Sequence, residues 1–126
     1  MAFTTSVSYT VTVSGGGANQ FVHTSAYDGQ SACSVTIAPA ASNFPVALAF
    51  NDTTLKSFVM WADAAMAVVF KDSANATVAT YTLIANNPII WNTDLGTANP
   101  FGDPVALLLV TSTPGGTLTV YAGNDI

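Results

Sequence analysis

The sequence predicts an all-β protein of one domain, an antiparallel β-sandwich of the jelly-roll type. Two observations support this fold class. Short apolar segments follow one another at regular spacing, separated by Gly, Pro, Asn and Asp, with little sign of helix. The chain also contains seventeen threonines, and β-branched polar side chains suit the solvent face of a strand. A length of 126 residues suffices for one core but not for two domains, so we expect residues 1–126 to form a single unit.

The first half of the chain predicts five strands. From Phe3 to Val13, apolar residues occupy most odd positions and Thr or Ser the even ones, which predicts a strand with one dry face. The triplet Gly15-Gly16-Gly17 ends this strand in a turn. The turn dipeptide Asp28-Gly29 separates the next two candidates. The further strands, each bounded by turn residues, are expected over 21–27, 32–37, 44–50 and 55–62.

The second half predicts another five strands. The Ala-rich piece Asp63 to Met66 is expected to form a helical turn before them. Val105 to Thr111 is almost continuously apolar, which is typical of a central strand buried on both faces. The longest connection runs from Asn92 to Pro104 and holds several Gly and Pro residues. The expected strands of this half lie over 67–71, 77–84, 89–91, 105–111 and 117–121.

The charge pattern excludes several classes of partner. Two lysines, no arginine and seven aspartates give a net charge of −5, with 7% of residues charged against about 25% in an average domain. Nucleic-acid binding and attraction to an anionic membrane both need clustered Lys and Arg. The apolar run from Ala64 to Phe70 falls far short of the roughly 18 residues of a membrane span. Because the first residues lack the pattern of a signal peptide, we expect a protein that is made in the cytoplasm and does not use general secretion.

Candidate catalytic and metal-binding residues are few, so the sequence predicts neither an enzyme nor a cofactor or metal site. His23 is the only imidazole and is interpreted as structural or surface-exposed. Cys33 is the only cysteine and is interpreted as a small core residue, because nothing beside it would activate the thiol. Four residues of the long loop have side-chain oxygens that could bind Ca²⁺: Asn92, Asp94, Asn99 and Asp103. Asn and Asp are also the ordinary residues of turns, and this second interpretation is preferred.

The predicted surface favours a protein that binds protein partners. With so few charges, strand faces and loops must be covered by Thr, Ser, Asn and Ala, and such a surface loses few hydrated ions when it is buried. Only two lysines are present to protect exposed sheet edges from non-specific pairing. We therefore expect a homo-oligomer or a component of a larger assembly.

Five segments of the chain follow one another in an order that matches a known family: Leu55–Met60, Tyr81–Leu83, Asn87–Asp94, Val105–Val110 and Leu118–Val120. Through them, residues 50–122 resemble small virion proteins of tailed bacteriophages that decorate the capsid as cement proteins. The resemblance implies a β-sandwich subunit on the outer surface of the phage head, often a homotrimer, that binds the major capsid protein and assembles in the host cytoplasm. The first 50 residues depart from the family's pattern.

Two contact regions are expected if this resemblance holds. Residues 1–6 would form an N-terminal arm, with Met1, Ala2 and Phe3 as contacts. The loop over 92–104 would contribute Asp94 and present Trp91 and Phe101 as aromatic anchors, although the preferred interpretation of Trp91 is an ordinary core residue. Two other functions stay open. One is a tail or fibre subunit, and the other a carbohydrate-binding module that uses exposed aromatic residues such as Trp61, Trp91 or Tyr121.

Overall fold

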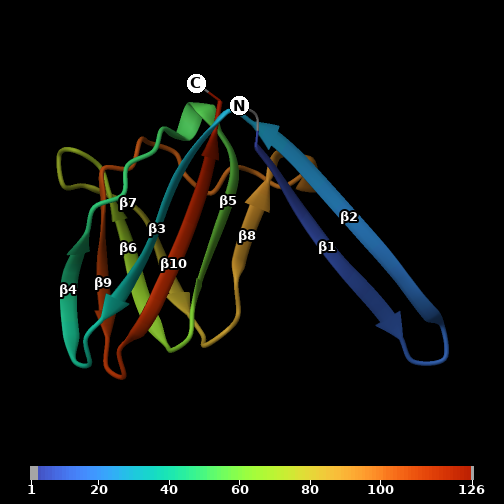
Figure 1. Ribbon diagram of the computed structural model, residues 1–126, viewed down its shortest axis with the longest axis horizontal. Helices are drawn as coiled ribbons and strands as arrows, with labels where there is room; N and C mark the ends of the chain where they lie inside the picture. Colours follow the sequence, from blue (N-terminus) through green and yellow to red (C-terminus); the bar gives the residue numbers. More distant parts are fainter. Residues whose placement is uncertain (1–2, 126) are drawn as a thin grey trace.

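The computed structural model describes residues 3–125, and of Phe3, residues 9–13 and Asn19 it describes the backbone alone. A long hairpin comes first, formed by β1 (Phe3–Val13) and β2 (Gly17–Tyr27). The following strands form a sandwich of two four-stranded sheets (Figure 1). Sheet 1 contains, in spatial order, β3 (Gly29–Ile37), β10 (Gly116–Asn124), β5 (Leu55–Ala62) and β8 (Ile89–Asn92). Sheet 2 contains β4 (Ala41–Val46), β9 (Leu107–Ser112), β6 (Met66–Lys71) and β7 (Thr77–Leu83).

The strand order of the sandwich is that of a jelly roll. β3 pairs with β10, β4 with β9, β5 with β8 and β6 with β7, so the first four strands pair in reverse order with the last four. The pairings of β10 with β5 and of β9 with β6 complete the two sheets, and every pair is antiparallel. The chain changes sheet at each connection except that between β6 and β7. This arrangement confirms the predicted fold class.

The core lies between the two sheets and follows from the period-two pattern of the strands. In β5, Phe58, Met60 and Ala62 are fully buried, while Val59 and Trp61 between them face outward. The loop before β9 adds Phe101, which is 3% exposed. Its ring centroid lies 4.9 Å from that of Phe58 and 5.0 Å from that of Phe70, both edge to face. A residue from an irregular loop thus completes the aromatic centre of the core.

Several expectations for secondary structure differ from the structure. β2 begins at Gly17 and β3 at Gly29, each three or four residues earlier than expected. Residues 63–65 bend without forming a helical turn, and Met66 already begins β6. The strand expected over 44–50 lies at 41–46, because a bulge between Ala41 and Phe44 starts it early and residues 47–49 cross between the sheets. β9 is central in sheet 2, as expected, but only one of its faces is buried.

Candidate interaction surface around the hairpin

The hairpin leaves the sandwich at one end and extends past the edge strand β8 (Figure 1). Its strands pair over their whole length, from Phe3 opposite Tyr27 to Val13 opposite Gly17. Because a strand rises about 3.3 Å per residue, the part beyond the pair of Val7 and His23 is roughly 20 Å long. A two-stranded hairpin alone is at best marginally stable in water. Its conformation therefore depends on contacts with other surfaces.

Tyr27 and Ser25 hold the base of the hairpin on the outer face of sheet 1. Both side chains are buried. The ring of Tyr27 covers Gly123 so closely that a Cβ added to this glycine would lie 2.5 Å from the ring. The Ser25 hydroxyl donates to the carbonyl oxygen of Lys56 at 3.1 Å and lies 2.8 Å from the hydroxyl of Thr93. Because Gly123 has no side chain, the ring of Tyr27 can pack directly on β10 and fix the base of the hairpin there.

Polar contacts with the loop after β8 add to this junction. The buried Asn92 donates through Nδ2 to the carbonyl oxygen of His23 at 3.3 Å. Asn92 Oδ1 also accepts from the backbone N–H of Asp94, as the N-cap of the short 3-10 helix Thr93–Leu95. Asp94 Oδ2 in turn accepts from the backbone N–H of Thr24 at 3.2 Å and lies 3.4 Å from His23 Nδ1. Because Asp94 is more than half exposed, its contact with His23 adds little stability even when the imidazole is protonated.

The outer face of sheet 1 becomes apolar next to the hairpin base. The strand register places Gly123, Ser57 and Asn92 in one row beneath β2, and Ser57 and Asn92 are almost completely buried there. One step further along the strands, the next outward-facing row consists of Tyr121, Val59 and Ile90. Tyr121 is 41% and Ile90 38% exposed. The hairpin therefore covers the first row of this face and leaves the second row accessible.

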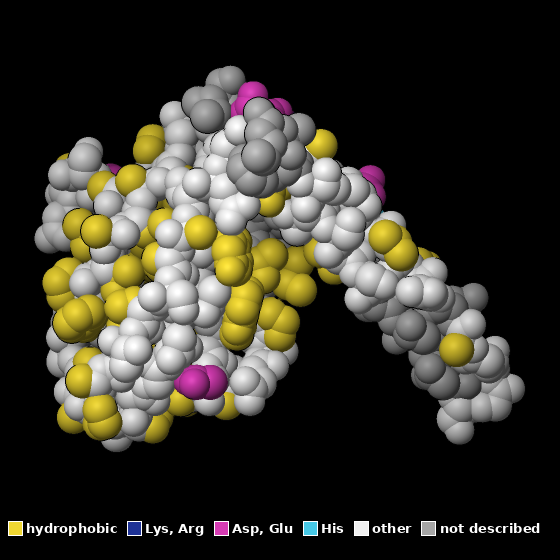
Figure 2. Space-filling model, in the orientation of Figure 1, with side chains coloured by type: hydrophobic (Ala, Val, Ile, Leu, Met, Phe, Trp, Pro, Cys, Tyr) yellow, Lys and Arg dark blue, Asp and Glu magenta, His cyan; other side chains and the backbone are white. Residues whose placement is uncertain are grey.

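Trp61 extends the apolar row towards the other end of β5. Its ring stacks on that of Tyr121, with centroids 5.8 Å apart and an interplanar angle of 28°. We call Val59, Trp61, Ile90 and Tyr121 the apolar strip. Figure 2 shows hydrophobic side chains gathered on the body beside the hairpin, with no basic side chain among the coloured atoms of this view. An uncharged apolar strip beside an extended hairpin is a feature typical of protein-binding surfaces.

The structure places the sequence-predicted contact residues in three different settings. Met1 and Ala2 lie outside the described residues. Phe3 begins β1 opposite Tyr27, so residues 3–6 belong to the paired base of the hairpin. The projecting part consists of residues 8–22, beyond the pair of Val7 and His23. Asp94 lies at the junction between hairpin and sandwich.

The two expected aromatic anchors are buried in the sandwich. Trp91 is 7% exposed and donates through Nε1 to the carbonyl oxygen of Thr97. This position matches the interpretation of Trp91 as an ordinary core residue. Phe101 is 3% exposed. The loop over 92–104 therefore does not present either ring at the surface of this chain, because both rings fill the core.

Two described side chains with reactive groups, those of Cys33 and Tyr81, have raised pKa values. Cys33 is half-buried on β3, and burial raises the pKa of its thiol, an effect that a backbone hydrogen bond at Val120 partly offsets. Burial also raises the pKa of the Tyr81 hydroxyl. Both groups are therefore held in their protonated forms. No group of three or more His, Cys, Asp or Glu side chains within the described residues is placed to hold a metal ion.

Two of the residues considered as calcium ligands have structural roles in the loop. Asn92 caps the 3-10 helix, as described above. Asn99 donates through Nδ2 to the carbonyl oxygen of Asp52 and accepts the backbone N–H of Phe101 through Oδ1. These are the local bonds by which Asn stabilises turns. Ordinary turn chemistry thus accounts for both amide side chains of this loop.

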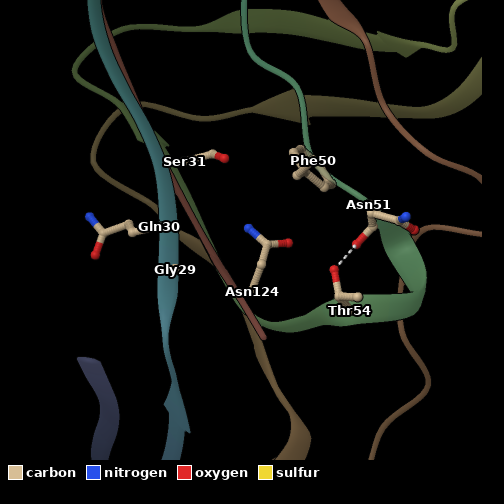
Figure 3. A pocket seen from close by; sticks show the side chains of 7 residues that line it. All are labelled: Gly29, Gln30, Ser31, Phe50, Asn51, Thr54 and Asn124. Atoms are coloured by element: carbon tan, nitrogen blue, oxygen red, sulfur yellow. Dashed lines mark hydrogen bonds between the residues drawn. The ribbon is translucent and has the colours of Figure 1, made fainter. Parts of the chain in front are cut away.

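A pocket of about 270 Å³ lies between the start of β3 and the loop before β5 (Figure 3). Gly29, Gln30 and Ser31 line one side, and the side chain of Asn124 points into the space between them and Thr54. Within the described structure the Oδ1 atom of Asn124 is buried without a hydrogen-bond partner, whereas its Nδ2 donates to the carbonyl oxygen of Ala122. The lining contains no carboxylate, imidazole or thiol, so it offers hydrogen bonds and no acid or base.

Comparison with known proteins identifies no relative. No protein-family model matches the chain, and no curated protein or solved structure matches it significantly. In the part of the chain that the structure describes, no helix has the length and apolar character needed to cross a membrane. The jelly roll and the surface around its hairpin are therefore the basis on which function is inferred.

Proposed function

We propose that the protein is a structural subunit that decorates the outer surface of a tailed-bacteriophage capsid and stabilises the contacts between capsomers. The observation that carries the proposal is the projecting hairpin, an element of two 11-residue strands outside the sandwich. A hairpin of this length depends on partners for its stability. The resemblance of residues 50–122 to capsid cement proteins supports the choice of partner.

The composition of the surface suits this role. Residues 1–27 contain no Asp, Glu, Lys or Arg, so an interface with the hairpin removes no ion from water. A protein that binds only the assembled shell stabilises that shell by its binding free energy. Repetition over a symmetric particle lets many weak contacts act together. Stabilisation of the shell thus requires no catalytic group.

The partners in this proposal are the major capsid protein and further copies of the chain. A homotrimer at three-fold positions is the arrangement that the family resemblance implies. Residence on the outer surface of the virion, after assembly in the host cytoplasm, belongs to the same proposal. No nucleic acid, membrane or cofactor takes part in it.

Copy number in the particle tests the proposal. Quantitative mass spectrometry of purified virions compares the amount of this protein with that of the major capsid protein. Decoration predicts a copy number of the same order as that of the capsid subunit or of the three-fold positions. A few copies per particle would instead favour a tail or fibre subunit, and absence from the particle would overturn the virion role.

A shortened hairpin tests the observation on which the proposal rests. Val7 and His23 are paired, so a two-residue Asn-Gly turn can join them in place of residues 8–22 while Ser25 and Tyr27 keep their seats. We expect this variant to fold and to lose occupancy on the particle. Phe44→Ser is the matched control, because Phe44 is 43% exposed on sheet 2, away from the hairpin. Full occupancy of the shortened variant would contradict a role for the hairpin.

A second candidate function is carbohydrate binding, favoured by the stacked pair of Trp61 and Tyr121. Tyr121 is 41% exposed, and aromatic faces of this kind bind the apolar faces of sugar rings. Trp91 is buried and is not available for this purpose. Glycan-array binding that is lost in Trp61→Ala and kept in Phe44→Ser would support this function. Absence of any binding by the wild-type chain would exclude it for the glycans on the array.

A further inference from the structure

We propose that the outer part of the hairpin docks on the apolar strip of a second copy of this chain, so that copies assemble by exchanging hairpins. The inference goes beyond capsid decoration, because it concerns how copies bind one another. It is tested on the purified chain without a capsid.

The hairpin base shows how this interface is built. β2 crosses sheet 1 from β10 to β8: Tyr27 covers Gly123, Ser25 bonds to Lys56, and His23 bonds to Asn92. The same face of β2 continues beyond β8, since every second residue of a strand points to the same side. The hairpin thus already packs on sheet 1 within one chain, and its outer part carries the same face away from the sandwich.

Apolar side chains lie on that face where the base of the hairpin ends and its outer part begins. Phe21 lies on the same side of β2 as Ser25 and Tyr27 and is 42% exposed. Val7, opposite His23 on β1, is half-buried. The even-numbered residues of β1 are all Ser or Thr. The odd-numbered face of the hairpin, which carries Val7 and Phe21, is therefore better suited to an apolar interface than the opposite face of β1.

The apolar strip is the matching surface. It lies in the row next to the one that β2 covers, so it continues an interface that the chain already uses. Neither the strip nor the hairpin before Asp28 contains an Asp, Glu, Lys or Arg. A basic or acidic partner would find no complementary charge on either surface. A second copy brings the face of the hairpin that carries Phe21 to a strip that likewise contains no Asp, Glu, Lys or Arg.

The occupant is a second copy because the chain's own hairpin is held away from this strip. The contacts of Tyr27, Ser25 and Asn92 direct the hairpin past the edge of β8 (Figure 1). Each chain contributes one hairpin and one strip, so reciprocal or cyclic exchange uses every hairpin and every strip. Such closed arrangements are the usual form of homo-oligomers.

Sedimentation velocity over a concentration series tests the interface from both sides. We expect the wild type to be oligomeric, and Phe21→Ser and Tyr121→Ser each to weaken association by about tenfold or more. Each variant has a control at an exposed apolar residue on another face. Val22→Ser alters the opposite face of β2, where Val22 is 58% exposed, and Phe44→Ser alters sheet 2. Both controls should change association by less than about threefold.

Cross-linking between two differently labelled chains tests the pairing itself. In a Cys33→Ser background, Phe21→Cys is placed in one chain and Ile90→Cys or Tyr121→Cys in the other. Oxidation of the mixture should give a product of twice the chain mass, and Val22→Cys in place of Phe21→Cys should give little. Thermal unfolding of each variant shows that its sandwich is intact.

Several outcomes would overturn the inference. The first is a wild-type chain that stays monomeric at the highest concentration. The second is an oligomer that both Phe21→Ser and Tyr121→Ser leave intact. The third is an oxidised mixture of Phe21→Cys and Tyr121→Cys chains that gives no cross-linked product containing both labels. A monomer that binds sugar through Tyr121 would assign the strip to carbohydrate. A monomer that is abundant on virions would refute the exchange and leave the decoration proposal standing. An oligomer that is absent from virions would refute the decoration proposal and leave the exchange of hairpins standing.

Discussion

Truncation of Phe101 gives the sharpest test of how the core is completed. The ring is 3% exposed, and its centroid lies 4.9 Å from that of Phe58 and 5.0 Å from those of Phe50 and Phe70. Phe101→Ala removes these contacts and leaves a cavity, which typically costs about 3–5 kcal/mol. Edge-to-face pairs add about 0.5–1.5 kcal/mol beyond buried area, but pairs that share one ring do not add fully. We expect a loss of about 4 kcal/mol.

Urea unfolding followed by tryptophan fluorescence measures this loss, and for a chain of this length it corresponds to a Tm about 10–15 °C lower. Phe44→Ala is the control, because Phe44 is 43% exposed and should cost less than about 1 kcal/mol. A double-mutant cycle with Phe58→Leu should show coupling between the two rings. A loss below about 1 kcal/mol in Phe101→Ala would refute the reasoning and return Phe101 to the role of a surface anchor.

Three further predictions concern single positions. Gly115→Ala should lower the free energy of unfolding by more than about 2 kcal/mol, because Gly115 has a φ of 71° and the added Cβ would meet backbone atoms 2.6–2.8 Å away. Gly96 has a similar φ of 76° but open space around it, so Gly96→Ala should lower the free energy of unfolding by about 1 kcal/mol in the same urea titration. Gly123→Ala should displace the ring of Tyr27 and speed hydrogen exchange in β2 while leaving β9 protected, and unchanged exchange in β2 would show that Gly123 is not the seat of the hairpin. Burial raises the pKa of the Cys33 thiol, so iodoacetamide at pH 8 should alkylate the folded chain more slowly than the urea-unfolded chain. As pH rises, the Cys33 thiol of the unfolded chain loses its proton at a lower pH than that of the folded chain. The free energy of unfolding should therefore decrease above the ordinary thiol pKa, and this decrease should be absent in Cys33→Ala.

The strands were predictable from sequence to the extent that their signals are local. The alternation of Phe3 to Val13 marks β1 at the expected position. Asp28 separates β2 from β3 as expected, but Gly29 already begins β3, and the two strands do not pair with each other. The start of β4 was missed because it depends on a bulge, in which Asn43 has a φ of 49° and donates its N–H to the hydroxyl of Thr111 on the neighbouring strand. The sequence of one strand does not reveal such a contact.

The candidate site was less predictable than the strands. Trp91 and Phe101 were weighed as exposed anchors because aromatic residues are common at interfaces, but a jelly roll of this size also needs large rings in its core. Asp94 was expected at an interface and lies at the junction of hairpin and sandwich. The role of Gly123 had no sequence signal, since a glycine in a strand does not indicate which ring approaches it.

The sequence by itself determined the all-β class, the approximate strand positions and the scarcity of charge. These properties depend on composition and on period-two patterns, which are local. Only the tertiary structure decided that the hairpin stands outside the sandwich, that Tyr27 is seated on Gly123, and that Val59, Ile90 and Tyr121 share an accessible row. These features depend on the register between strands that lie tens of residues apart. A shift of one residue in either pairing would turn the same side chains to the opposite face.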